Sequence, residues 1–403
     1  MKILHFLIPF LIIGCGIQNQ ESASAQQNHN ILFTEISQIK PGAQRTDLYM
    51  DMISGKTVGL ICNHTSFVGN RHLVDTLVKS GIDVKVIFSP EHGFRGQAEN
   101  GAEISDEKDQ LTGIKVISLY GNKKQPAPSD LAGLDVLIFD IQDVGVRFYT
   151  YISTLALVME AAARENIPLI ILDRPNPNGF YIDGPVLDTN FSSFVGMHPV
   201  PVVYGMTIGE YGLMVNGESW LNGLTCDLTV IPVSGYSHKM LVKLSIAPSP
   251  NLPDWESIYL YPSLCLFEGT IISVGRGTGK PFRVFGHPDY LAGSYAFTPE
   301  RIPGVSENPP YMGKTCFGTD VTMYAANFRD NPNHFTLQYL LTTYQAMNFR
   351  DDYFNSYFNK LAGNATLMRD IKSGMTESEI RKSWEKDLSA FKIIRSKYLL
   401  YPE

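Results

Sequence analysis

Residues 134–172 read LDVLIFDIQDVGVRFYTYISTLALVMEAAARENIPLIIL. The almost wholly apolar run at 134–140 predicts a buried strand, the stretch 150–165 has the periodicity of a helix, and residues 168–172 predict a second strand after a short turn. Two strands separated by a helix are typical of a βαβ crossover, which joins parallel strands. This part of the chain therefore predicts a parallel sheet covered by helices on both faces.

The same alternation continues on both sides of this stretch. Apolar runs bounded by turn residues predict further strands at 57–62, 84–89, 115–119, 201–204 and 228–233. Helices are predicted at 71–80, which is followed by Gly81 at the usual place of a C-cap glycine, and at 207–221. We expect a doubly wound, Rossmann-like α/β domain at 31–285.

The sequence changes character after residue 285. Residues 286–318 are rich in Pro, Gly and Tyr, which predicts an irregular connection. Helical periodicity returns at 335–347 and at 376–397, and the second of these stretches opens with the capping-box pattern Thr376-x-x-Glu379. We expect residues 286–403 to form a smaller, helix-rich α+β domain.

The first residues predict export and a lipid anchor. Lys2 precedes an apolar run that is too short to span a bilayer and is typical of a signal peptide. The run ends at Ile13-Gly14-Cys15, which resembles a bacterial lipobox, so residues 1–14 are a predicted lipoprotein signal peptide and Cys15 the lipidated first residue of the mature chain. An ordinary signal peptide with a chance cysteine is the alternative. The polar residues 15–30 predict a flexible tether, so we expect a protein anchored to a bacterial membrane and facing the periplasm or the cell surface.

Composition excludes several other classes of protein. Of the 403 residues, 44% are hydrophobic and 18% are charged, which is a globular rather than a disordered mixture. The net charge is −7 and no run of Lys or Arg stands out, which argues against nucleic acid as a partner. Five cysteines in a chain of this length do not make a disulfide scaffold. Three of the four cysteines beyond Cys15 lie in apolar surroundings and are expected to be buried.

Polar loops follow four of the predicted strands, at 63–66, 89–96, 140–149 and 173–179. In an open parallel sheet, ligands bind in the crevice beyond the carboxyl ends of the strands. Because these loops would converge at one edge of the sheet, they predict a functional cleft that contains carboxylates, guanidinium groups, amides and a tyrosine.

The charged residues of these loops also have structural alternatives. Asp140 and Asp173 could cap the turns that follow them, and Arg147 and Arg174 could pair with these aspartates inside the protein. Glu91 lies in a tight loop at a strand end, where a carboxylate contributes little to packing. We therefore expect Glu91 to be functional.

No standard cofactor or metal motif is present in the sequence. The first strand is not followed by G-x-G-x-x-G, the glycine-rich run at 275–280 fails the phosphate-loop spacing, and there is no H-E-x-x-H, C-x-x-C or G-x-S-x-G. His64, Glu91 and His92 could form only a weak metal cluster, and His92 could instead orient Glu91 or cap its loop. We expect neither a metal nor a cofactor.

Several separate motifs occur in a characteristic order. They are Pro90-Glu91-His92-Gly93, Asp140-x-x-Asp143-x-Gly145-x-Arg147-x-Tyr149, Asp173-Arg174-Pro175-Asn176-Pro177, and Phe267-Glu268-Gly269-Thr270 followed by Gly275-Arg276-Gly277-Thr278. Together they resemble the NamZ family of exo-β-N-acetylmuramidases, from about residue 45 to the C-terminus. The resemblance implies a Rossmann-like domain joined to a smaller C-terminal domain with the active site in the cleft between them. It also implies release of N-acetylmuramic acid from the non-reducing ends of peptidoglycan fragments.

Glycoside hydrolysis usually needs two carboxyl groups on either side of the scissile bond. Glu91 is the predicted acid/base, with His92 beside it, and either Asp140 or Asp143 is the second carboxylate. In a substrate-assisted reaction, that aspartate would orient the 2-acetamido group of the sugar instead of attacking it. The sequence leaves these mechanisms open.

The predicted binding residues follow from the chemistry of the sugar. Muramic acid carries a lactyl carboxylate, for which Arg147, Arg174 and Arg276 are the candidate cations. Tyr149 and Phe282 could supply an apolar wall for the sugar ring. Polar residues of the same motifs and loops complete the predicted binding set: Asn63, Asp173, Asn176, Glu268 and Thr278.

Two other functions fit the same sequence. A non-catalytic lipoprotein that captures muropeptides or other acidic glycans for uptake would use the same cleft and arginines but would not need Glu91. An esterase or deacetylase acting on wall material would lack its usual serine elbow or zinc pattern.

Overall fold

Six parallel strands form the central sheet of the computed structural model, which describes residues 39–91, 93–95, 107–326 and 334–403. They are β1 (Thr57–Cys62), β4 (Asp83–Ser89), β6 (Lys115–Ser118), β7 (Val136–Asp140), β8 (Leu169–Leu172) and β9 (Leu228–Ile231). Across the sheet they follow the order β6-β4-β1-β7-β8-β9, with β5 (Glu107–Lys108) antiparallel to β6 at one edge. Counted along the chain, the parallel strands have the order 3-2-1-4-5-6 of a Rossmann fold, which confirms the predicted fold class.

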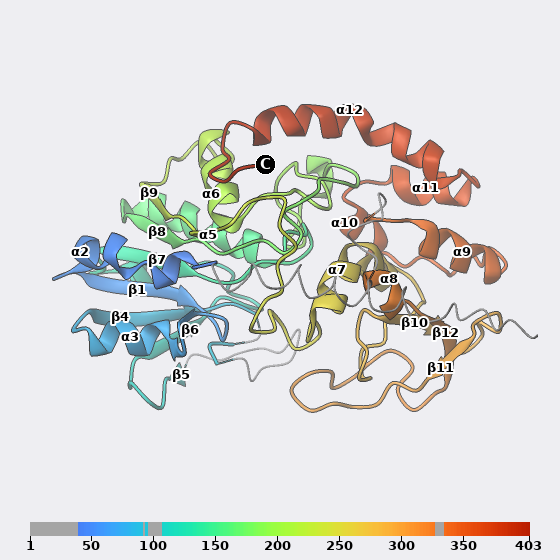
Figure 1. Ribbon diagram of the computed structural model, residues 1–403, viewed down its shortest axis with the longest axis horizontal. Coiled ribbons are helices and arrows are strands. Elements are labelled where there is room, and N and C mark those ends of the chain that lie inside the picture. Colours follow the sequence, from blue (N-terminus) through green and yellow to red (C-terminus); the bar gives the residue numbers. More distant parts are fainter. Residues whose placement is uncertain (1–38, 92, 96–106, 327–333) are drawn as a thin grey trace, which may run out of the picture. The chain divides into compact units, whose positions relative to one another are not determined.

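Helices cover both faces of this sheet because its strands are apolar on both sides. Val58 and Ile138 point to the face covered by α3, whereas Ile61 and Phe139 point to the face covered by α5 and α6. Figure 1 shows α3 beside β4 and α6 beside β9. The helices of this half are α2 (Met50–Ile53), α3 (Leu73–Lys79), α4 (Pro128–Leu131), α5 (Tyr151–Glu165) and α6 (Ile208–Gly217). A small hairpin, β2 (Phe67–Val68) with β3 (Arg71–His72), follows β1.

The predicted strand at 201–204 is wrong. Val203 makes only isolated bridges, to Val146 and to Asp183, and does not join the sheet. The segment is apolar because it is buried beside the loop that follows β7, and burial alone produces the pattern that predicted a strand.

The C-terminal half, expected to be α+β, contains a second sheet whose strands the sequence did not locate. The antiparallel strands β10 (Val284–His287), β12 (Cys316–Asp320) and β11 (Tyr295–Phe297) lie in the order β10-β12-β11, where an irregular connection was expected. A Cβ atom on Gly318 would lie 1.8 Å from the carbonyl oxygen of Phe285, so glycine is required for the close approach of β10 and β12. Glycines that resemble loop composition in the sequence are therefore part of this sheet.

Helices make up most of the remaining C-terminal half, as predicted (Figure 1). They are α7 (Trp255–Leu264), α8 (Thr322–Ala326), α9 (Gln338–Ala346), α10 (Phe358–Ala362), α11 (Thr366–Lys372) and α12 (Glu377–Arg395). The capping box predicted for α12 is confirmed, because Thr376 accepts a hydrogen bond from the amide of Glu379 and the Glu379 carboxylate accepts one from the amide of Thr376. Single turns of 3-10 helix occur at Gly42–Gln44, Thr46–Leu48 and Thr189–Phe191, with a longer one, η5, at Cys265–Gly269.

One hydrophobic cluster extends through both halves of the described chain, from Ile61 of β1 to Phe391 of α12. The sheet domain and the C-terminal helices therefore share a core. Cys62, Cys226, Cys265 and Cys316 are all buried and unpaired. Among the helices of the described ranges, none has the length and apolar content needed to cross a membrane.

Candidate active site

A cavity of about 420 Å³ lies where loops of the parallel sheet meet segments of the C-terminal half. Glu91 follows β4, Tyr120 follows β6, and residues 148–151 follow β7 and begin α5. The other lining residues come from later parts of the chain: Ser193–Val195, Ser249, Asn251, Leu252, Tyr261, Cys265, Glu268, Arg276, Phe282, Tyr357 and Lys360–Leu361. We refer to this space as the cavity. Its position at the carboxyl ends of parallel strands agrees with the general rule for ligand sites in open α/β sheets.

Glu91 occupies the cavity, as expected from its place in a tight loop. It lies in a turn that Gly93 closes with its amide on the carbonyl of Pro90, and the φ of Gly93 is 76°. Glu91 is 9% exposed, and its Oε2 accepts a hydrogen bond from the hydroxyl of Thr150 at 2.9 Å. Burial raises the pKa of Tyr120. The charge of Glu91 and the hydrogen bond between Glu91 and the Tyr120 hydroxyl raise it further. His92, the predicted neighbour, lies outside the described residues.

Asp140 and Arg174 form a buried ion pair away from the cavity. The Nε of Arg174 lies 2.6 Å from Oδ1 of Asp140, and Nη2 lies 2.9 Å from Oδ2. Both side chains are nearly inaccessible to solvent, at 0% and 7% exposure. The sequence left open that Arg174 pairs with an aspartate inside the protein, and this pairing is the one observed. Neither residue is placed to touch a ligand in the cavity.

Asp143, the other predicted second carboxylate, is also buried and does not line the cavity. Its Oδ2 accepts hydrogen bonds from the amide of Gly145, at 2.7 Å, and from the hydroxyl of Tyr204. Burial raises the pKa of Asp143 to about 6, and these two hydrogen bonds only partly oppose the rise. The geometry assigns Asp143 to holding the loop after β7.

The prediction that Arg147 binds the sugar is wrong. Arg147 holds backbone segments together inside the protein. Its guanidinium is fully buried and donates to the carbonyls of Pro185, Val200, Leu361 and Ala362 at 2.7–2.9 Å. These carbonyls belong to two segments that are far apart in the sequence and whose neighbours line the cavity. Arg147 therefore joins two walls without reaching the cavity itself.

The remaining polar loop residues have structural contacts too. Asp173 accepts from the hydroxyls of Thr207 and Tyr401 and from the amide of Gly209, so it holds the start of α6 and the end of the chain. Burial raises the pKa of Asp173 to about 6. Asn176 donates to the carbonyl of Met206 and accepts from the amide of Asn178. None of these side chains lines the cavity.

Asn63 contributes only indirectly. Its Oδ1 accepts from the amide and hydroxyl of Thr65, and its Nδ2 donates to the hydroxyl of Tyr151 at 3.0 Å. Tyr151 lines the cavity and donates a longer hydrogen bond, of 3.4 Å, to the backbone carbonyl of Glu91. Asn63 thus orients a cavity residue without lining the cavity.

Glu268 and Arg276 face the cavity as an ion pair. The Nε of Arg276 lies 2.6 Å from Oε1 of Glu268, and the guanidinium lies 5.0 Å from the centre of the Phe282 ring. Burial lowers the pKa of Arg276, but the charge and hydrogen bond of Glu268 outweigh burial and raise it. Within the described ranges, Nη1 and Nη2 of Arg276 have no hydrogen-bond partner. Arg276 therefore keeps two donors for an anion in the cavity.

A glycine-flanked turn presents Arg276. Gly275 and Gly277 have φ values of 75° and 78°, a region that favours glycine, and a Cβ on Gly277 would lie 2.5 Å from the carbonyl oxygen of Glu300. Thr278 closes the turn by donating from its hydroxyl to the carbonyl of Gly275 at 2.7 Å. Thr278 was a predicted sugar ligand, but its hydroxyl holds this turn and it does not line the cavity.

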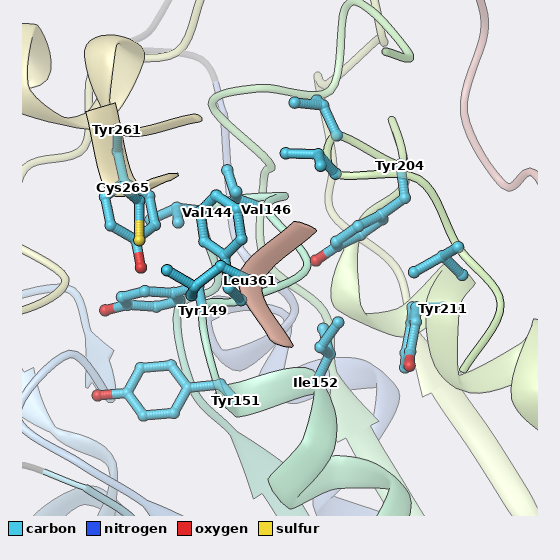
Figure 2. Packing of buried hydrophobic residues seen from close by; sticks show 14 of the residues in the cluster. Val144, Val146, Tyr149, Tyr151, Ile152, Tyr204, Tyr211, Tyr261, Cys265 and Leu361 are labelled. Atoms are coloured by element: carbon cyan, nitrogen blue, oxygen red, sulfur yellow. The ribbon is translucent and has the colours of Figure 1, made fainter. Parts of the chain in front are cut away.

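Aromatic rings form one wall of the cavity. Figure 2 shows Tyr149 and Tyr151 side by side, with their hydroxyl groups on the same side, and Tyr261 beside Cys265. The Tyr149 and Tyr151 rings are 4.9 Å apart and nearly perpendicular, and Tyr261 makes the same kind of contact with Phe282 at 4.9 Å. The predicted wall of Tyr149 and Phe282 is thus part of the cavity lining.

Several lining residues were not predicted, namely Tyr120, Lys124, Thr150, Ser193, Phe194, Asn251, Tyr357 and Lys360. Tyr120 follows β6 directly, so the rule that placed the other loops at the strand ends would have found it. Ser193 and Asn251 each carry a buried oxygen without a hydrogen-bond partner in the described part of the chain. Unpaired buried oxygens at a cavity wall indicate a place for water or a ligand.

The cavity combines the groups that sugar chemistry uses. Among the described residues, its lining contains two carboxyl groups, on Glu91 and Glu268, together with a guanidinium, two lysines, several hydroxyls and an aromatic wall. Within the described ranges, no three His, Cys, Asp or Glu side chains lie together in a group that could hold a metal ion.

The fold and the cavity define an α/β protein in which a Rossmann-like sheet domain is completed by a C-terminal half that supplies one side of the site. The chain belongs to the NamZ family. Residues 58–256 match the family model described as exo-beta-N-acetylmuramidase NamZ, N-terminal, and residues 259–401 match its C-terminal counterpart. The resemblance noted in the sequence is confirmed. The two models meet near residue 257.

Relatives cover nearly the whole chain. The chain is 39% identical over 379 residues to the peptidoglycan beta-N-acetylmuramidase NamZ of Bacillus subtilis, which covers 88% of this chain and 89% of that protein. A crystal structure of a DUF1343 family protein from Bacteroides fragilis is 43% identical, covers 91% of this chain and 99% of its own, and superimposes with a TM-score of 0.83. A second Bacteroides fragilis protein of that family is 28% identical, with a TM-score of 0.76 over 90% of this chain and 99% of its own.

Proposed function

We propose that this protein is an exo-acting glycoside hydrolase that releases N-acetylmuramic acid from the non-reducing ends of peptidoglycan fragments. The observation that carries the proposal is a single cavity in which two carboxyl groups, Glu91 and Glu268, occur together with an arginine that keeps two donors for an anion. Family membership supports it, because the Bacillus subtilis relative is described as a peptidoglycan beta-N-acetylmuramidase.

Glu91 is the proposed acid/base of the reaction. It lies in the cavity at the end of β4 and is held by the hydroxyl of Thr150, so its carboxyl group has a defined position. A positioned carboxyl group can move a proton to or from the glycosidic oxygen or the attacking water. Asp140 and Asp143 are buried outside the cavity, so Glu268 is the candidate second carboxylate among the described residues that line it.

Arg276 is the proposed ligand of the lactyl carboxylate. N-acetylmuramic acid differs from N-acetylglucosamine by a lactyl ether at O3, and a planar guanidinium binds a carboxylate with two parallel hydrogen bonds. Glu268 and Phe282 fix the guanidinium from one edge and one face. The aromatic wall formed by Tyr149 and Tyr261 supplies apolar surface for the sugar ring.

The test is product analysis on defined glycan fragments. Fragments that end in N-acetylmuramic acid and fragments that end in N-acetylglucosamine are incubated with the protein, and released monosaccharides are identified by mass spectrometry. Free N-acetylmuramic acid from the first set, released much faster than any N-acetylglucosamine from the second, is the expected result. Tight binding of the fragments without any product would identify a carbohydrate-binding lipoprotein and overturn the proposal.

We further propose that the mature protein is a lipoprotein attached to a bacterial membrane through Cys15, facing the periplasm or the cell surface. The lipobox-like Ile13-Gly14-Cys15 supports this location, although these residues lie outside the described ranges. Cys15→Ser is expected to release the protein from the membrane fraction or to leave it unprocessed. Cell fractionation and intact mass measure this, and a processed Cys15→Ser variant that stays with the membrane would refute it.

A further inference from the structure

Thr150 stands at the N-cap of α5, the helix that begins at the cavity, but it does not cap that helix in the usual way. A threonine at this position normally accepts a hydrogen bond from an amide of the first turn. Thr207 of α6 and Thr376 of α12 do so, with ψ values of 167° and 157°. Thr150 has a ψ of −4° and makes no side-chain cap bond. Its hydroxyl is directed to another partner.

That partner is Glu91, whose Oε2 accepts from the Thr150 hydroxyl at 2.9 Å. The backbone carbonyl of Thr150 accepts from the amides of Ser153 and Thr154, so Thr150 already belongs to the first turn of α5. The Glu91 carboxylate consequently lies against the N-terminal end of a helix of 15 residues. The helix dipole and the hydroxyl both favour the negatively charged form of a carboxyl group at that end.

Three tyrosines lie close enough to Glu91 for its charge to contribute to their raised pKa values. They are Tyr120 after β6, Tyr151 on α5 and Tyr357 just before α10. Lys124 and Lys360 line the same cavity. At the start of α5, Thr150 donates to the Glu91 carboxylate, whereas Tyr151 on the same helix donates to the backbone carbonyl of Glu91.

We propose that Thr150 is a positioning residue that holds the Glu91 carboxyl group in one orientation and favours its ionised form. The inference rests on the proposed function for its kinetic consequence, because Thr150 acts on the sugar only through Glu91. This role of Thr150 requires its hydroxyl group and not its methyl group. Removing the hydroxyl raises the pH at which Glu91 loses its proton and leaves the carboxyl group less well placed for proton transfer.

The experiment compares Thr150→Val, which keeps the shape and loses the hydroxyl, with Thr150→Ser, which keeps the hydroxyl. Thr154→Val makes the same change one turn later on α5, at a buried residue whose hydroxyl contacts the carbonyl of Thr150 at 3.4 Å and not Glu91. For each variant, the rates on a chromogenic β-N-acetylmuramide are measured from pH 4 to pH 9, with the thermal midpoint as a check on folding.

The expected result is a drop in kcat of roughly tenfold for Thr150→Val, with KM changed by less than about twofold. The limb of the pH profile that belongs to Glu91 should move upward by about one pH unit, because a hydrogen bond to a charged group is lost. Thr150→Ser and Thr154→Val should retain the profile of the unmodified protein. An unchanged profile in Thr150→Val, or an equal loss in Thr150→Ser, would overturn the inference.

A second readout keeps this result separate from the proposed function. The carboxyl carbon of Glu91, labelled with ¹³C and assigned by its absence in Glu91→Gln, is titrated by NMR in the unmodified protein and in Thr150→Val. An upward shift of the Glu91 pKa in Thr150→Val supports the role of Thr150 even if no muramide is cleaved. An equal pKa in the two proteins refutes it. Failure of the unmodified protein on the muramide would count against the proposed function alone.

Discussion

Replacing Arg276 by Ala is expected to remove most of the preference for N-acetylmuramic acid over N-acetylglucosamine. A cation that binds only the lactyl carboxylate contributes to the rate on one sugar and not to the rate on the other. Arg276 has the geometry for this role: Glu268 holds its Nε at 2.6 Å, and its side chain is 17% exposed at the cavity. Removing the guanidinium also leaves the Glu268 carboxylate unpaired, which adds repulsion toward an anionic sugar.

The magnitude follows from the contact. A hydrogen bond to a charged group contributes about 1.5–3 kcal/mol, and each 1.4 kcal/mol is about tenfold in rate or affinity. Arg276→Ala should therefore lower kcat/KM on a chromogenic β-N-acetylmuramide by a factor roughly 10- to 150-fold larger than the factor on the β-N-acetylglucosaminide, which reports the loss of the Glu268 contact alone. Arg276→Lys keeps the charge without the planar fork, so its loss should be intermediate.

Arg283 provides a matched control for this experiment. Its side chain is 16% exposed and lies 3.2 Å from a carboxylate oxygen of Asp254, but it does not line the cavity. Arg283→Ala should retain the ratio of the two rates, whatever its effect on the thermal midpoint. If Arg276→Ala lowers both rates by the same factor, or leaves their ratio unchanged, Arg276 does not recognise the lactyl group.

Two further predictions concern residues that the structure places outside the cavity. Arg147→Lys leaves buried carbonyls such as those of Val200 and Leu361 without a donor. It should therefore lower the free energy of unfolding, measured by urea denaturation, by about 3 kcal/mol. The ratio of rates on the two sugars should stay the same. Asp143 has a folded-state pKa of about 6 against an ordinary value of 3.8, so its contribution favours folding below pH 4 and is lost as the pH rises through 6. Asp143→Asn should reduce the fall in unfolding free energy between pH 4 and pH 7 by about 1–3 kcal/mol. Parallel curves for the unmodified protein and Asp143→Asn would contradict this.

The central sheet could be predicted from the sequence because its signals are local. Each parallel strand is a short apolar run between turn residues. The capping-box pattern of Thr376 and Glu379 marks the first residues of α12. The second sheet could not be predicted in this way. Its strands are three to five residues long, and Gly318 is needed for contact between strands that are distant in sequence.

Some residues of the candidate site could also be predicted from the sequence, whereas others could not. The rule that parallel strands end at one edge led to Glu91 and Tyr149, and the Gly-Arg-Gly-Thr motif led to Arg276. A sequence shows which side chains carry charge, but it does not show where they point. Arg147 donates to carbonyls as many as 215 residues away, so no local pattern could separate this internal role from a role in sugar binding.

The acid/base carboxyl group is the centre of the proposed mechanism, and Glu91→Gln tests it most directly. The amide keeps the shape of the side chain and can still accept the hydrogen bond from Thr150, but it cannot transfer a proton. The measurement is the rate on the chromogenic β-N-acetylmuramide together with the thermal midpoint of the same variant. We predict a rate lower by roughly 10²–10⁴-fold at an unchanged midpoint. A Glu91→Gln variant that folds normally and retains most of its rate would contradict the account.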